Sequence, residues 1–299
     1  MTGSVWQRQR SNLEAYAFLA PFLVAYLLFL IYPFLKGVWI SLHEWNLLAV
    51  TFNPGAKKLV GGENFIEILT GDRRFWQIVG NTVLFVLLTV PAVTMIAMGL
   101  AIMMNRATKA MAVFRTLFFL SQVLSVTVVT LVWQMMYSPR QGLIANLLAL
   151  LGLGPIEWVT DPLLAMPAIV IATVWWSLGF ALVVFLAGLQ EIPGELYEAA
   201  RLDGAGHYAV LRHIIIPGLR RTTTFVAVMQ IVLHFQVFGQ SHLITGGGPN
   251  DRTQVLVRYI YQTAFRDSEV GYASALAICL FAVMLVFSIV QLRLNRSTP

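Results

Sequence analysis

The residues best placed to do chemistry lie in one polar segment, Glu198–Pro217, which reads EAARLDGAGHYAVLRHIIIP between two long apolar runs. The sequence contains no G-x-x-x-x-G-K-[ST] phosphate-binding loop and no H-E-x-x-H, C-x-x-C or G-x-S-x-G pattern. No nucleophile, metal-ligand set or nucleotide site can therefore be assigned. If ATP takes part in the function, its hydrolysis belongs to another chain.

The local sequence predicts two short helices in this segment, joined by a glycine elbow. Pro193 suits a first helical turn, where its missing N–H group has no helical partner to lose. Helices commonly end at a residue with a left-handed backbone conformation, and Gly204 suits that position. Gly206 permits a second bend. His207–Ile215 should form the second helix, which we expect Pro217 to end. The predicted product is a compact L-shaped knob rather than a flexible linker.

Composition places this segment in a membrane protein. Of the 299 residues, 58% are hydrophobic and only 11% are charged, whereas about 25% is usual for soluble domains. Six stretches are free of charge and long enough for a helix to cross about 30 Å of hydrocarbon, and the ten-residue alternation of a membrane barrel is absent. We therefore predict an all-α membrane protein with one transmembrane domain, residues 1–299, and six spans. The predicted spans are residues 13–35, 75–104, 112–137, 163–189, 222–240 and 271–292, with a polar loop at 191–217.

The charge distribution indicates the orientation of the spans. The short connection between spans two and three, NRATKAMAVFR, is purely basic and favours the cytoplasmic side. An even number of spans then places both termini in the cytoplasm and Thr245–Pro249 outside. The net charge of +6 is explained by this topology rather than by binding to nucleic acid. The single cysteine, Cys279, lies in the sixth run, so there is no disulfide framework.

Polar side chains within the spans suggest a path for a solute. Gln230 and His234 are four residues apart and share a helix face in span five, while Asn81 and Gln122 lie in spans two and three. The span cores carry no Asp, Glu, Lys or Arg, although proton-driven transporters usually need such groups. Amides and aromatic rings suit an uncharged polyhydroxyl ligand such as a sugar. Packing of these polar groups against neighbouring spans is the alternative explanation.

The polar segment resembles the EAA loop of importer-type ABC permeases, in which E-A-A, D-G-A and an aliphatic residue before proline occur in this order. The matching residues are Glu198, Ala199, Ala200, Asp203, Gly204, Ala205, Ile216 and Pro217. Other blocks match over nearly the whole chain: Asn81-Thr82, Phe118–Leu120, Trp133, Gly142–Ile144 and the sequence TGGGP at Thr245–Pro249. The last block resembles the outer loop of the carbohydrate-type group, which includes maltose and glycerol-3-phosphate permeases. Ser121 and Arg221 depart from the pattern, since the family often has proline there.

The resemblance implies a complete functional scheme. The chain would be a permease subunit in a bacterial cytoplasmic (inner) membrane, surrounded by lipid. Its coupling loop at 191–217 would dock on an ABC ATPase dimer, which would hold ATP and magnesium, while this subunit itself needs no cofactor. A second permease subunit would complete the pathway, and an extracytoplasmic solute-binding protein would deliver a carbohydrate-like solute.

Two other functions are compatible with an apolar polytopic chain. A secondary carrier or channel for a small polar solute would leave the E-A-A segment unexplained and would lack intramembrane charge. A membrane-embedded enzyme would need site residues that the sequence does not offer. Neighbouring reading frames that encode an ATPase, a second six-span chain and a secreted binding protein would favour the importer.

Overall fold

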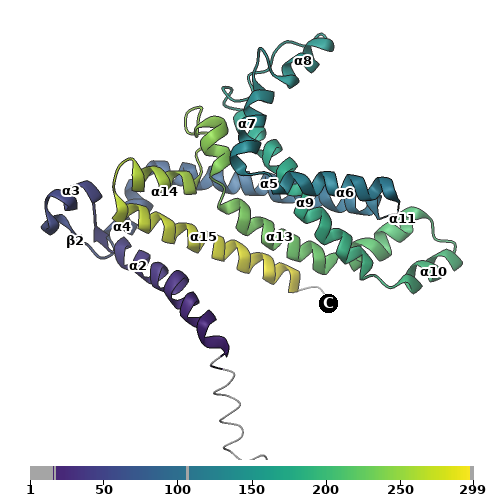
Figure 1. Ribbon diagram of the computed structural model, residues 1–299, viewed down its shortest axis with the longest axis horizontal. Helices are drawn as coiled ribbons and strands as arrows, with labels where there is room; N and C mark the ends of the chain where they lie inside the picture. The colour runs from purple at the N-terminus through teal and green to yellow at the C-terminus, as the bar shows by residue number, and fades with distance from the viewer. Residues whose placement is uncertain (1–15, 17, 106–107, 297–299) are drawn as a thin grey trace, which may run out of the picture. The chain divides into compact units, whose positions relative to one another are not determined.

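The computed structural model describes residues 16, 18–105 and 108–296 and divides into two compact units (Figure 1). The first unit takes in the chain up to Gly71 together with Ile260–Ile278, and the second takes in Asp72–Tyr259 and the chain from Cys279 onward. The start of the predicted first span and part of the basic connection, residues 106 and 107, lie outside the described residues.

The first unit combines an apolar helix with a small polar cap. The helical stretch Phe18–Ser41 includes the π-helical turn η1 (Leu27–Ile31) and α2 (Tyr32–Ser41). A two-stranded antiparallel ribbon follows, in which His43 faces Leu59 and Glu44 faces Lys58. The buried Asn64 side chain holds this turn, since its Nδ2 donates to the carbonyl oxygens of Ser41 at 2.8 Å and His43 at 3.1 Å. The cap elements are β1 (His43–Glu44), α3 (Leu47–Phe52), η2 (Pro54–Ala56), β2 (Lys58–Leu59), α4 (Glu63–Ile66) and η3 (Glu67–Gly71).

An acidic cavity of about 400 Å³ lies in this unit and is lined by four glutamates, Glu44, Glu63, Glu67 and Glu269. Burial raises the pKa of the Glu269 carboxyl above its usual value, and the nearby carboxylates of Asp267, Glu67 and Glu44 add to the shift. A raised pKa in the folded state means that the ionised form is disfavoured there. Stability is therefore lost as the pH rises from the unfolded-state pKa through the folded-state pKa.

Glu269→Gln should accordingly stabilise the protein at neutral pH, because the amide avoids the cost of partly burying a charge and removes the repulsion among carboxylates. Glu269 is solvent-exposed, so we expect a gain of only about 1–3 °C in the melting temperature. The gain should disappear below pH 4, where the wild-type carboxyl is protonated. Thermal unfolding in detergent at pH 7.5 and pH 3.5 measures this, and Glu195→Gln, an exposed acid in the second unit, is the control. A gain that persists at pH 3.5 would contradict the electrostatic explanation.

The second unit is a bundle of long helices. Figure 1 shows α5 (Arg73–Met104) alongside α9 (Ala165–Gln190), with α6 (Lys109–Val123) also packed on α9 and α13 (Arg220–Phe235) packed on α5. Seven of the sixteen buried residues of α9 are alanine, glycine or threonine, and such small residues let neighbouring backbones approach closely. The other elements wholly in this unit are α7 (Val126–Tyr137), α8 (Leu143–Leu150), α10 (Gly194–Leu202), α11 (His207–Val210), η4 (Leu211–Ile215), α12 (Ile216–Gly218) and η5 (Ser241–Thr245). The helices α14 (Leu256–Phe265) and α15 (Val270–Arg296) each belong partly to both units.

Four described helices are long and apolar enough to cross a membrane: Phe18–Ser41, Arg73–Met104, Ala165–Gln190 and Val270–Gln291. They correspond to predicted spans one, two, four and six. The predicted fifth span is shorter than expected, because α13 has 16 residues and ends at Phe235. At 1.5 Å per residue this helix is about 24 Å long.

The predicted third span, residues 112–137, is not one straight helix. It consists of α6 and α7, which meet at an angle of 103°. Leu124 between them is extended, with φ −68° and ψ 139°, and the Oγ of Ser125 accepts the Val128 N–H at 3.4 Å as the N-cap of α7. The indole N–H of Trp176 donates to the Leu124 carbonyl at 3.2 Å and satisfies one group that the break leaves free. Capping by Ser125 thus starts a new helix inside a run that carries no charged residue.

Candidate functional site

The E-A-A segment forms α10, which ends in a left-handed glycine. Gly204 has φ +72°, as the sequence predicted for the end of this helix. The Gly204 N–H donates to the Arg201 carbonyl at 3.1 Å, and the Ala205 N–H donates to the Ala200 carbonyl at 2.8 Å. These two bonds make up the Schellman arrangement, which satisfies the last carbonyl groups of a helix. The elbow is therefore a closed, hydrogen-bonded turn.

The outer surface of this loop combines an exposed carboxylate with exposed apolar side chains. Glu198 is exposed and makes no hydrogen bond or ion pair with the described residues. Leu202 is 89% exposed and Tyr208 is 71% exposed. Exposed apolar side chains beside an unpaired carboxylate are typical of a protein–protein contact. Ala199, Asp203 and Pro217 are also exposed, whereas Ala200 and Ala205 are half-buried.

The second half of the loop corrects one prediction. Pro217 does not end the helix, because the helical backbone continues through α11, η4 and α12 to Gly218, and the break comes at Leu219 with φ −81° and ψ 0°. Pro217 stands in the first turn of α12, directly after the π-helical turn Leu211–Ile215. Proline lacks the N–H group and crowds the preceding turn, and a widened turn leaves room for its ring.

Gln230 and His234 are buried between helices of the second unit. Gln230 is 1% exposed and His234 is 4% exposed. The Nε2 of His234 lies 3.3 Å from the Oγ of Ser177 in α9, and its ring is 6.1 Å from the ring of Phe85 in α5. The Nδ1 of His234 lies 2.7 Å from the Gln230 carbonyl oxygen. The two side chains thus share one face of α13, at its junction with α5 and α9.

Two buried polar atoms on α5 and α13 have no hydrogen-bond partner among the residues that the structure describes. The side-chain Oε1 of Gln230 is buried without a hydrogen bond among the described residues, and so is the Oγ1 of Thr89 in α5. Buried polar atoms without partners are rare in folded proteins, and each calls for an explanation.

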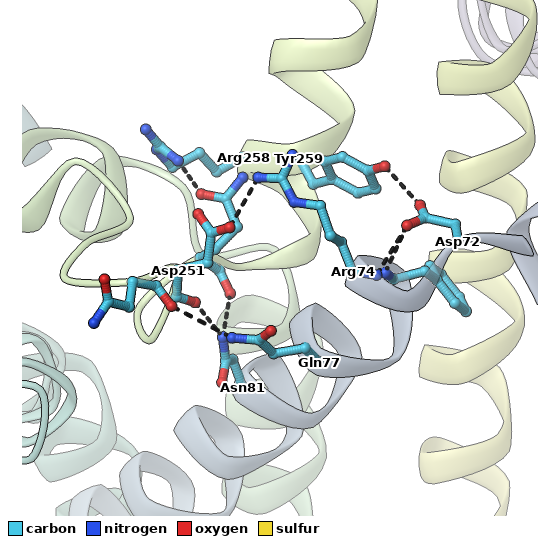
Figure 2. Close-up of polar contacts among 10 residues, drawn as sticks. Asp72, Arg74, Gln77, Asn81, Asp251, Arg258 and Tyr259 are labelled. Atoms are coloured by element: carbon cyan, nitrogen blue, oxygen red, sulfur yellow. Dashed lines mark hydrogen bonds and ion pairs between the residues drawn. The ribbon is translucent and has the colours of Figure 1, made fainter.

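Asn81 contacts the backbone of a loop in the second unit. Figure 2 shows its side chain directed at the backbone of the loop that follows η5. Its Nδ2 donates to the Asp251 carbonyl at 2.7 Å and to the Gln254 carbonyl at 3.1 Å. Nearby, Arg74 pairs with Asp251 at 2.9 Å, and the Tyr259 hydroxyl donates to Asp72 at 2.6 Å. Asn81 therefore fastens this loop to the first turns of α5.

Replacing Asn81 with leucine should loosen the loop. The change leaves two carbonyl groups without a donor, and an unsatisfied buried group costs about 1–3 kcal/mol. We expect faster hydrogen exchange in residues 246–255 with little change in the core of α9. Gln77→Leu is the matched control, because Gln77 reaches the Asn250 carbonyl only at 3.5 Å. Equal exchange in both variants would contradict the role of Asn81.

Gln122 is exposed near the end of α6, just before the bend. The four predicted path residues thus occupy three different settings: a buried helix junction, a loop attachment and an exposed bend. Sequence reasoning missed Ser177, the hydroxyl partner of His234. It sits beside Trp176 in an apolar run, and no local pattern marks it.

Comparisons with known proteins agree with this architecture. Residues 68–298 match the family described as binding-protein-dependent transport system inner membrane component. The probable ABC transporter permease protein YurN of Bacillus subtilis is 34% identical over 288 residues, covering 95% of this chain and 96% of the relative. The trehalose/maltose transport system permease protein MalF of Thermococcus litoralis is 32% identical over 281 residues, covering 94% of this chain and 93% of the relative.

A solved structure shows the same fold. A chain of a bacterial ABC transporter involved in the import of the acidic polysaccharide alginate superposes with a TM-score of 0.80 at 22% identity, with 98% of each chain covered. The fold is thus that of an ABC importer permease, and the relatives are membrane components rather than enzymes. By its family match and its relatives, this chain belongs to the binding-protein-dependent transport system inner membrane components.

Proposed function

We propose that this chain is one permease subunit of an ATP-driven importer for a sugar or sugar-like solute. The observation that carries the proposal is the similarity, at 30% identity or more over at least 90% of the chain, to permeases named for sugar transport. These include the trehalose/maltose permease of Thermococcus litoralis, the diacetylchitobiose permease of Streptomyces coelicolor and the arabinooligosaccharide permease of Bacillus subtilis. The exposed E-A-A elbow supports the same function, because it offers a docking surface for an ATPase.

The proposed coupling site consists of seven of the eight residues that match the family motif: Glu198, Ala199, Ala200, Asp203, Gly204, Ala205 and Pro217. The exposure of five of them and the closed turn at Gly204 support a rigid knob that fits a socket on an ATPase subunit. In this scheme the ATPase dimer supplies ATP chemistry, a second permease completes the pathway, and a binding protein delivers the solute. A related solved complex contains an alginate pentasaccharide-bound periplasmic protein.

The proposed solute contacts of this subunit remain Gln230 and His234. Both are buried in the conformation described here, so a solute would reach them only after α5, α9 and α13 move apart. The uncharged character of this junction favours a neutral ligand. Asn81 and Gln122 are weaker candidates, since Asn81 is engaged by a loop and Gln122 lies apart from the junction.

We further propose six spans, with α6 and α7 together as the third and α13 as the fifth. Cysteines introduced one at a time at exposed positions Lys109 and Arg252, in a Cys279→Ser background, test this topology. An impermeant thiol reagent added to intact cells should label Arg252→Cys and leave Lys109→Cys unlabelled. Permeabilised cells, in which both should react, provide the control. Labelling of Lys109→Cys alone in intact cells would overturn the topology.

Transport itself is tested by reconstitution. The permease should be purified in complex with an ATPase and a second permease and placed in proteoliposomes with the solute-binding protein. We expect ATP-dependent uptake of one member of a panel of radiolabelled oligosaccharides. ATP-dependent uptake of amino acids or inorganic ions with no uptake of any sugar would contradict the proposed solute class.

A further inference from the structure

A cavity of about 290 Å³ lies at the end of α7 within the second unit. It is formed by the last turn of α7, the turn Glu157–Thr160 and Ile244 of η5. Its size is close to the lower end of the range for small-molecule sites, about 300–1,000 Å³, and suits a single sugar ring. It contains neither Gln230 nor His234, so it is separate from the proposed intramembrane contacts.

Aromatic rings form one wall of this cavity. The rings of Tyr137 and Trp158 lie 5.5 Å apart with 33° between their planes, and Trp133 continues the row at 5.2 Å from Tyr137. Tyr137 is 2% exposed, and its hydroxyl donates to the Ala168 carbonyl of α9 at 2.8 Å. Trp158 is only half-buried. The wall thus consists of the partly exposed Trp158 ring, followed by the buried rings of Tyr137 and Trp133.

Polar groups stand on the rim of the same cavity. Glu157 is exposed, and its Oε2 accepts the Thr160 hydroxyl at 2.6 Å. Glu157 has no ion-pair partner among the described residues. The Gln134 amide also lines the cavity, and its Nε2 donates to the Leu243 carbonyl. The second oxygen of the Glu157 carboxylate has no partner within the described part of the chain.

We propose that this cavity is a subsite for one uncharged pyranose ring; the inference rests on the proposed sugar-import function. The apolar face of a pyranose can cover the Trp158 ring, because indole offers a large apolar surface. Its hydroxyl groups can donate to the Glu157 carboxylate, and hydrogen bonds to an ionised acceptor are stronger than neutral ones. The same carboxylate repels a sugar acid, so the subsite should discriminate against uronates.

Binding can be measured on the assembled transporter in nanodiscs without its binding protein. Saturation-transfer NMR with methyl α-D-glucopyranoside and methyl α-D-galactopyranoside as probes reports contact with a ring, and methyl α-D-glucuronide is the charged counterpart. We expect a neutral glycoside to bind and the glucuronide to bind at least tenfold more weakly. Trp158→Ala should weaken neutral binding at least tenfold, whereas Trp76→Ala, an exposed tryptophan on α5, should leave it unchanged.

A second variant keeps the inference falsifiable if Trp158→Ala disturbs folding. Glu157→Gln retains a hydrogen-bond acceptor but removes the charge. The ratio of the affinity for the glucoside to the affinity for the glucuronide should therefore fall at least threefold. Neutral-sugar binding that is unchanged in Trp158→Ala, together with unchanged discrimination in Glu157→Gln, would overturn the subsite. That result with intact ATP-dependent sugar uptake would overturn the subsite alone, whereas uptake of no sugar by the wild type would overturn the proposed function.

Discussion

Replacing Glu198 with alanine should reduce ATP-dependent uptake at least tenfold while leaving the protein inserted in the membrane. Glu198 has no partner within the described chain and lies on the exposed side of the coupling knob. If it docks on the ATPase, its carboxylate becomes a buried, hydrogen-bonded group there. Truncating one member of such a pair costs about 2–5 kcal/mol. Pull-down of the ATPase and solute-stimulated ATP hydrolysis measure the effect in the reconstituted complex.

Three companion variants separate docking from other causes. Glu195→Ala removes the same charge from the same helix but lies outside the E-A-A motif, so it should retain most activity. Gly204→Val should match the loss in Glu198→Ala, because a branched side chain at φ +72° is strained. Gly206→Val should cause a smaller loss of uptake, since Gly206 has an ordinary φ of −74°. Normal stimulated ATP hydrolysis in both Glu198→Ala and Gly204→Val would disprove the coupling role.

Gly179→Val should destabilise the helix bundle itself. A Cβ atom at Gly179 would lie 2.5 Å from the Phe118 carbonyl oxygen and 2.9 Å from the Phe119 Cα. Both atoms belong to the backbone of α6, so no side chain can rotate away and the two helices must separate. Overpacking of this kind costs about 1–3 kcal/mol or more, and the separation would also weaken the contact between α6 and α9. We expect a melting temperature in detergent lower by about 5 °C or more and low expression.

Gly99→Ala provides the matched control for a change at a helical glycine. Gly99 lies inside α5, and a Cβ atom there would meet nothing within 4 Å. Alanine favours the helix by about 0.5–1 kcal/mol over glycine, so Gly99→Ala should be neutral or slightly stabilising. The melting temperature of Gly179→Ala should lie between those of Gly99→Ala and Gly179→Val. An unchanged melting temperature in Gly179→Val would show that α6 and α9 do not approach as closely as described.

The sequence by itself determined the features that depend on local pattern. Long charge-free runs identified the apolar helices, because only a helix or closed barrel satisfies its backbone groups in hydrocarbon. The order of Glu198, Asp203 and Gly204 located the end of α10 and its left-handed residue, since that conformation depends on the glycine itself. The same residues carried the resemblance to ABC permeases that the family match later bore out.

Only the tertiary structure decided how the spans are broken and what the polar residues contact. The 103° bend at Leu124 depends on a serine cap and on an indole from α9, some fifty residues away in sequence. Asn81 and His234 look alike as polar groups in apolar runs, yet one holds a loop and the other lies in a helix junction. Their surroundings come from distant segments, such as Asp251 for Asn81 and Ser177 for His234. A one-dimensional periodicity cannot specify such partners, because it records which face of a helix a residue occupies and not what packs against that face.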